Sequence, residues 1–130
     1  MIKYLLDTNI CIYMIKNGNE TGIARHFDQC EFGEIAISAV TLAELSCGFT
    51  KHNDAEQMMS ILGNIILKDF DADAANVFGQ LWQKHPNRKN NIDRMVAAHA
   101  ISLNAILVTN NTADFAVYED SGLRLENWTS

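Results

Sequence analysis

The chain has 130 residues, of which 48% are hydrophobic and 20% are charged, and its net charge is −6. These values fit one globular domain over residues 1–130 and argue against a disordered or collagen-like chain. The three cysteines are an odd set without a Cys-x-x-Cys pair, which argues against a disulfide framework and favours a reducing cytoplasm. No stretch approaches the roughly 20 apolar residues of a membrane helix, so we expect no membrane association.

The first half of the chain alternates short apolar runs with amphipathic segments. The run at the start ends abruptly at the polar residue Asp7, and Asn17 and Gly18 interrupt the helical pattern that follows. The expected elements are a strand over Ile2–Leu6, a helix ending near Asn17, a short helix over Thr21–Gln29, a strand over Ile35–Ile37, a helix after Ser38 and a helix around Met58–Leu62.

The second half repeats this alternation and contains the only proline, Pro86, in a basic loop. The expected elements are a strand over Ile65–Phe70, a long helix with Asp71 as its N-cap, a loop over His85–Asn91, a helix over Ile92–Leu103, a strand over Ala105–Val108, a short helix within Thr109–Asp114 and an edge strand at Leu123–Leu125. Strands that alternate with helices predict an α/β fold, with three α/β/α layers around a mainly parallel sheet.

Four acidic residues follow the predicted strands or lie in helices near strand ends. Asp7 ends the first strand, and Glu44 lies in the helix after the second. Asp93 opens the helix after the basic loop, and Asp114 follows the strand Ala105–Val108. Because the carboxyl ends of parallel strands form the usual functional crevice of an α/β sheet, we expect all four acids to meet there.

Each acid also has an explanation that involves folding alone. Asp7 fits a helix N-cap, and Glu44 completes a capping box that begins at Thr41. Asp93 and Asp114 could complement the positive end of a helix dipole. The small residues that share a helix face with Asp93 nevertheless favour an acid that points into the protein.

A cluster of carboxylates requires a cation, because like charges about 4 Å apart repel by about 4 kcal/mol at an effective dielectric constant of about 20. Without a cation, the acids would take up protons instead. Oxygen ligands without a thiol or an imidazole favour Mg²⁺ or Mn²⁺ over zinc. The pattern therefore predicts metal-assisted hydrolysis of a phosphodiester by an activated water.

Four segments together resemble the PIN-domain ribonucleases, and most closely the VapC toxins of bacterial toxin–antitoxin pairs. The resemblance runs through essentially the full chain, in order and at normal spacing. Each segment is a weak signal alone, but the four together are highly specific. The segments are Asp7–Asn9, Thr41–Leu45, Asp93–Ala100 and Val108–Phe115.

This resemblance implies a Mg²⁺-dependent endoribonuclease, with Mn²⁺ able to replace Mg²⁺. Its catalytic acids would be Asp7, Glu44, Asp93 and Asp114. Asp7 and Asp93 would be the direct metal ligands, and the other two acids would complete the shell directly or through water. Thr8 and Asn9 would support Asp7 by hydrogen bonding, and Asn111 or Thr112 would help to orient Asp114.

The resemblance also implies an RNA substrate such as transfer RNA, a homodimer, and a small VapB-type antitoxin that covers the acidic pocket. Three basic residues in or beside the loop, Arg88, Lys89 and Arg94, could hold RNA phosphates, although a solvated surface loop explains the same charges. The alternative for the whole chain is a non-catalytic PIN-like module that binds protein or RNA and keeps its acids for folding.

Overall fold

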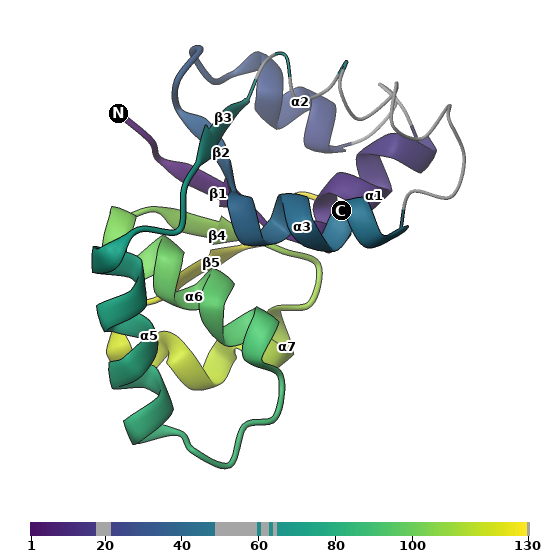
Figure 1. Ribbon diagram of the computed structural model, residues 1–130. Helices are drawn as coiled ribbons and strands as arrows, with labels where there is room; N and C mark the ends of the chain where they lie inside the picture. Colours follow the sequence, from purple (N-terminus) through teal and green to yellow (C-terminus); the bar gives the residue numbers. More distant parts are fainter. Residues whose placement is uncertain (18–21, 49–59, 61–62, 64, 130) are drawn as a thin grey trace.

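The computed structural model of the protein describes residues 1–17, 22–48, 60, 63 and 65–129. Within these residues, five parallel strands form one sheet in the order β3-β2-β1-β4-β5 (Figure 1). The strands are β1 (Tyr4–Leu6), β2 (Ile35–Ser38), β3 (Ile66–Lys68), β4 (Ile106–Val108) and β5 (Arg124–Glu126). The sheet confirms the predicted parallel α/β architecture, and each predicted strand contributes to it.

The helices lie close to their predicted positions. They are α1 (Thr8–Asn17), α2 (Gly22–Asp28), α3 (Ala39–Gly48), α5 (Ala72–Lys84), α6 (Asn91–Leu103) and α7 (Thr112–Phe115), followed by the 3₁₀ helix η1 (Ala116–Ser121). The predicted helix around Met58–Leu62 falls almost entirely outside the described residues. Among the helices that the structure describes, none is long and apolar enough to cross a membrane.

The two faces of the sheet form separate cores, because neighbouring residues of a strand point to opposite sides. Leu5 of β1 packs with residues of α5 and α6, among them Val96. The next residue, Leu6, packs on the other face with residues of α1, α2 and α3, among them Ile10 and Leu45. Figure 1 shows α5 and α6 side by side on their face, so the three predicted layers are present.

Side-chain caps set the ends of the two helices on this face. Asp71 Oδ1 accepts the backbone N–H of Ala74 at 3.0 Å, which confirms the predicted N-cap of α5. Asn90 Oδ1 accepts the backbone N–H of Asp93 at 3.0 Å and begins α6. At the other end of α6, Asn104 takes a left-handed conformation with φ of 54°, which asparagine tolerates. Asp93 is thereby fixed in the first turn of α6.

The start of α3 differs from the capping box considered for Glu44. The cap is Ser38, whose Oγ accepts the backbone N–H of Val40 at 3.1 Å. Thr41 lies inside the helix and is buried, and its hydroxyl has no hydrogen-bond partner among the described residues. Thr41 and Glu44 therefore do not form a capping box, and the Glu44 side chain is available for another contact.

The strand order places a topological switch point at the centre of the sheet. The chain leaves β1 towards β2 and β3 on one side, and then returns to β4 on the other side of β1. In open α/β sheets, the crevice outside the carboxyl ends of two such strands is where ligands bind. Asp7 follows β1 directly and Thr109 follows β4 directly, so both residues lie at this crevice.

Candidate metal centre

Asp7 lies at the carboxyl end of β1, and its carboxylate is held by three donors. Its Oδ1 accepts the backbone N–H of Thr8 at 2.8 Å, and its Oδ2 accepts the Asn9 side-chain amide at 3.0 Å and the Thr109 hydroxyl at 3.0 Å. The residue is only 5% exposed. These contacts agree with the predicted support of Asp7 by its two neighbours, although Thr8 provides it through its backbone.

The charge on Asp7 is only partly compensated by these donors. Burial raises the pKa of the Asp7 carboxyl above its ordinary value, and the nearby negative charge of Glu44 raises it further. The hydrogen bonds from Thr8, Thr109 and Asn9 lower the same pKa. Because the net shift is upward, the pocket favours either a proton or a positive ion beside this carboxylate.

Thr109 is a supporting residue that sequence reasoning missed. Its buried hydroxyl donates to Asp7 and accepts the backbone N–H of Asn111 at 3.0 Å, and it also lies 3.3 Å from the amide nitrogen of Asn9. The backbone N–H of Asp7 in turn donates to Val108 O at 2.9 Å. The sequence signal was only that this polar residue follows a predicted buried strand directly, and the pairing of β4 with β1 is what brings it to the same crevice.

Asp93 approaches the crevice from the first turn of α6. Its carboxylate is half-buried and, within the described part of the chain, accepts no side-chain hydrogen bond. Burial raises the pKa of Asp93 to about 6, and the charges of Asp7, Glu44 and Asp114 contribute in that order. Arg88 acts in the opposite direction and lowers this pKa. Asp93 is thus the acid whose pKa is raised by the charges of all three other predicted acids.

Glu44 and Asp114 form the exposed edge of the same cluster. Glu44 Oε1 accepts a hydrogen bond from the hydroxyl of Thr8, which connects α3 to the start of α1. Asp114 Oδ2 accepts the side-chain amide of Asn111 at 2.6 Å, as the predicted supporting role of Asn111 requires. Of the two residues expected to orient Asp114, Asn111 makes the contact, and no side-chain hydrogen bond from Thr112 to these acids is present in the described residues.

The arrangement fits a hard cation that keeps part of its water shell. Among the described residues, no group of three or more His, Cys, Asp or Glu side chains is arranged to hold a metal ion by itself. Mg²⁺ does not need such a cage, because it usually binds through one or two carboxylates and retains several waters. The four acids offer only carboxylate oxygens as ligands, and burial, together with the charges of neighbouring acids, raises the pKa values of Asp7 and Asp93. Carboxylate oxygens are the ligands that hard divalent cations prefer, so the chemistry of these side chains fits a divalent metal ion.

The basic loop lies against this cluster, but its three basic residues differ in position. Arg88 and Lys89 are exposed, and Arg88 Nη2 donates to the backbone carbonyl of Asp114 at 3.0 Å. Arg94 is fully buried, and its guanidinium hydrogen-bonds within the protein. The prediction that Arg94 contacts RNA is therefore wrong for this structure, because no part of its side chain reaches the surface.

The fold and its acidic crevice match a known family. The family model described as the PIN domain matches residues 4–120. The chain belongs to the PIN-domain family. Among curated relatives of this PIN domain, the tRNA(fMet)-specific endonuclease VapC of Shigella flexneri is 36% identical, covering 99% of this chain and 100% of the relative. Ribonuclease VapC2 of Rickettsia felis is 35% identical, covering 96% of this chain and 97% of the relative.

Solved structures give the same result for the fold of this PIN domain. VapBC2 from Rickettsia felis, bound to a DNA fragment from its promoter, has a TM-score of 0.86 and 34% identity, covering 98% of this chain and 99% of that chain. DNA-bound VapBC from Salmonella typhimurium has a TM-score of 0.82 and 32% identity, with the same coverage. This PIN domain is therefore of the VapC ribonuclease type, and the family predicted from its four motifs is confirmed.

Proposed function

We propose that the protein is a divalent-metal-dependent endoribonuclease that acts as the toxin of a toxin–antitoxin pair. The observation that carries this proposal is the position of Asp93, whose pKa is raised to about 6 by burial and by the three other acids. A site that crowds carboxylates in this way gains free energy when a cation enters it. The family membership supports RNA as the substrate.

Asp7 and Asp93 are the residues that would hold Mg²⁺ directly. Asp7 is already oriented by three donors, and no side-chain hydrogen bond from the described residues holds the Asp93 carboxylate. When bound, the ion would supply positive charge that stabilises the attacked phosphate and makes a water more acidic. Glu44 and Asp114, which are more exposed, would accept hydrogen bonds from water around the ion and help to orient it.

The residues around the acids have separate tasks in this proposal. Thr8, Asn9 and Thr109 keep Asp7 in one orientation, and Asn111 does the same for Asp114. Arg88 and Lys89 present positive charge beside the acids and would bind the phosphates of the RNA chain. The hydrolysis would leave a 5′-phosphate and a 3′-hydroxyl, because attack in line expels the 3′ oxygen.

We further propose that the substrate is a structured RNA such as a transfer RNA. A relative is named as a tRNA(fMet)-specific endonuclease, which supports this class of substrate. Single-stranded loops with unstacked bases are the parts of a structured RNA that proteins usually recognise. The partner would be a VapB-type antitoxin, since the similar solved structures are VapBC complexes. The protein would act in the cytoplasm as a homodimer built from this one domain.

The decisive experiment is incubation of the purified protein with total RNA, with and without a chelator. We expect specific fragments that disappear when the chelator is present. Asp7→Asn and Asp93→Asn should each reduce the cleavage rate by more than the roughly 10- to 100-fold typical of losing an outer partner of a metal site. Asp28→Asn, an exposed acid at the end of α2, is the control of equal charge and should cut normally.

The competing function is a non-catalytic module that binds RNA or protein. It predicts RNA binding without cleavage and no change of Mg²⁺ affinity in the two aspartate variants. Fragments that persist in chelator, or that are produced equally by Asp93→Asn, would contradict the nuclease proposal.

A further inference from the structure

The loop between α5 and α6, residues 85–90, carries Arg88 and Lys89 and contacts the segment of Asp114 in the acidic cluster. Arg88 Nη2 donates to the backbone carbonyl of Asp114 at 3.0 Å, so this exposed guanidinium lies at the edge of the metal centre. A loop that only covered the protein would not need a defined shape. Two sets of contacts hold this loop: hydrogen bonds from Arg94 of α6 to its backbone, and a contact of its first residue, His85, with η1.

The first set of contacts comes from Arg94, one residue after Asp93 in α6. Its Nη2 donates to the backbone carbonyls of His85 at 2.9 Å and Arg88 at 2.6 Å. Its Nη1 donates to Asn91 Oδ1 at 2.6 Å. Every hydrogen bond that the structure gives Arg94 thus goes to the loop or to the first residue of the helix that follows it.

The environment of Arg94 is unusual for a buried charge. The side chain is fully buried, and no carboxylate pairs with it among the described residues. Its guanidinium carbon lies 4.6 Å from the ring centroid of Trp82 and 5.9 Å from that of Phe78. Rings and carbonyls therefore take the place of a counter-ion. The planar fork of Arg94 sets the relative positions of two loop carbonyls and of Asn91, because its two terminal nitrogens bond all three groups.

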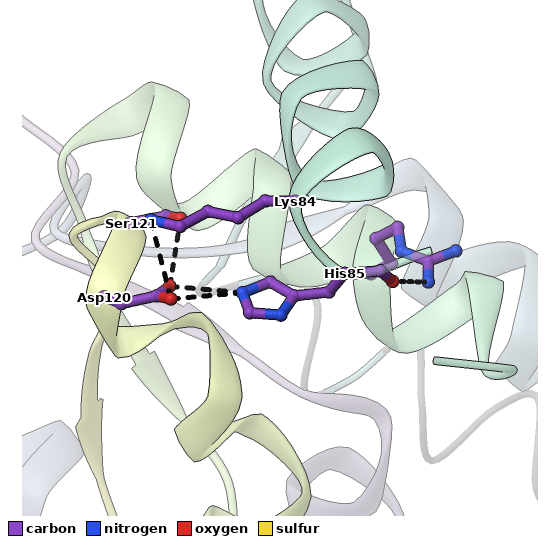
Figure 2. Close-up of polar contacts among 5 residues, drawn as sticks. Lys84, His85, Asp120 and Ser121 are labelled. Atoms are coloured by element: carbon purple, nitrogen blue, oxygen red, sulfur yellow. Dashed lines mark hydrogen bonds and ion pairs between the residues drawn. The ribbon is translucent and has the colours of Figure 1, made fainter. Parts of the chain in front are cut away.

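A second anchor fixes the first residue of the loop to η1. His85 Nε2 lies 3.2 and 3.3 Å from the carboxylate oxygens of Asp120, and Lys84 Nζ lies 3.5 Å from the same carboxylate. Figure 2 shows the His85 ring facing Asp120, with Lys84 reaching the same side chain. The helix η1 continues directly from α7, which carries Asp114. The loop is therefore held relative to the segment that supplies the last acid of the cluster.

We infer that Arg94 is a positioning residue: by holding the carbonyls of His85 and Arg88, it keeps the Arg88 guanidinium at the edge of the acidic cluster, where Arg88 binds an RNA phosphate. This inference rests on the proposed function. It assigns to Arg94 an indirect role, through Arg88, in place of the direct RNA contact expected from the sequence.

The test is RNA binding measured in an Asp7→Asn background, so that the RNA is not cut. Bulk transfer RNA is the probe, and its affinity is followed from about 50 to about 200 mM salt. Arg88→Ala and Arg94→Met should each weaken binding about tenfold. Each should also reduce the slope of log affinity against log salt by about 0.7, the contribution of one phosphate contact on a single strand. The double variant should bind no more weakly than either single variant, because both remove the same contact.

Two further variants distinguish positioning from a general effect of charge or folding. Arg124→Met removes another arginine that holds a backbone carbonyl, Asn104 O at 2.7 Å, and should leave the salt slope unchanged. Arg94→Lys keeps the charge but loses the fork, so it should bind as weakly as Arg94→Met. If Arg94→Met does not fold, Arg94→Lys takes its place in the double variant with Arg88→Ala.

Three results would overturn the inference: normal binding by folded Arg94 variants, full rescue by lysine, or additive losses in the double variant. A parent protein that neither binds nor cuts RNA would instead end the proposed function and this inference together. Cleavage and binding by the parent with no effect at Arg94 would remove the positioning role alone.

Discussion

Asp7 and Asp93 are held in different ways although both face the same crevice. Asp7 receives three hydrogen bonds, which lower its pKa against the effect of burial, whereas Asp93 receives none from the described side chains and its pKa rises to about 6. Burial and the charges of the other acids therefore raise the pKa of Asp93 without an opposing side-chain hydrogen bond from the described residues. The difference gives this residue a measurable signature in the absence of any divalent ion.

We expect Asp93→Asn to be more stable than the parent at pH 7 without metal, and the difference to shrink as the pH falls below 6 and to vanish only below the ordinary pKa of 3.8. The folded-state pKa of about 6 exceeds the ordinary value of 3.8, so the folded protein binds the additional proton between these values. Stability from this group is therefore present at low pH and is lost as pH rises through 6. Thermal unfolding in chelator at several pH values measures the difference.

The comparison between variants is needed because other groups titrate nearby. His99 has its pKa lowered by burial, so its contribution to stability falls as the pH drops, in the opposite direction. That contribution is common to both proteins and cancels in their difference. A stability difference that stayed constant from pH 7 to pH 5 would show that Asp93 is not protonated near pH 6.

The environment of individual side chains was also the feature that the sequence predicted least well. The acids Asp7 and Asp93 could be proposed from their positions at strand and helix ends, because that position depends only on the order of elements. The buried state of Arg94 was missed, although Ala97 and Ala98, three and four residues later, are buried on the same helix face. The helical periodicity therefore indicated a buried side chain at position 94, whereas the adjacent basic loop suggested an exposed one.

At the scale of elements, a hydrogen bond between Ser38 and His99 joins the end of β2, which leads into the helix of Glu44, to α6, which supplies Asp93. The Ser38 hydroxyl lies 2.8 Å from His99 Nδ1, and its oxygen accepts the N–H that begins α3. Because the hydroxyl oxygen is an acceptor there, its hydrogen is free to donate to the ring. His99 Nε2 is buried and has no hydrogen-bond partner among the described residues, so within them this bond is the ring's main polar contact.

Ser38→Ala should therefore destabilise the fold by about 1–3 kcal/mol, the usual cost of leaving a buried polar group unpaired. Urea unfolding at constant pH measures the free energy. The matched control is Ser46→Ala, whose hydroxyl donates to Leu42 O on an exposed part of α3. This control should change stability by no more than about 0.5 kcal/mol. Equal effects of the two substitutions would mean that the contact between β2 and α6 contributes nothing beyond an exposed hydrogen bond.

Elements with a clear hydrophobic period were predictable, and those defined by local geometry were not. The strands and the long helices α5 and α6 follow from apolar runs and from the cap at Asp71. The 3₁₀ helix η1 has no such period, and it ends at Gly122 with φ of +102°. Its position matters for function because Asp120 in η1 holds the start of the basic loop, a contact that no local pattern indicates.

At the scale of the whole molecule, the strand order explains why four distant acids share one crevice. Neighbouring parallel strands β1 and β4 end at the same edge, and α3 and α6 contact each other and bring their acids towards it. The sequence predicts the parallel sheet from its alternation of elements. It does not state which strands are neighbours, so it cannot place Thr109 beside Asp7, and the contact between these two residues comes from the fold alone.

Since the acids come from separate elements, a cation that they share should stabilise the entire fold. Binding to the folded state alone adds about 2.7 kcal/mol at a ligand concentration about 100 times the Kd, or roughly 10 °C in Tm for a domain of this size. We expect Mg²⁺ to raise the Tm of the parent at pH 7.5 and a chelator to reverse the rise.

The matched variants make this expectation specific to the crevice. Asp93→Asn and Asp7→Asn should remove the Mg²⁺-dependent rise, and Asp28→Asn should retain it because that acid lies at the exposed end of α2. At pH 5 the rise should shrink in the parent, because the proton on Asp93 competes with the ion. A rise of equal size in all four proteins would mean that Mg²⁺ acts on the general surface charge, and the four acids would then have no common ligand.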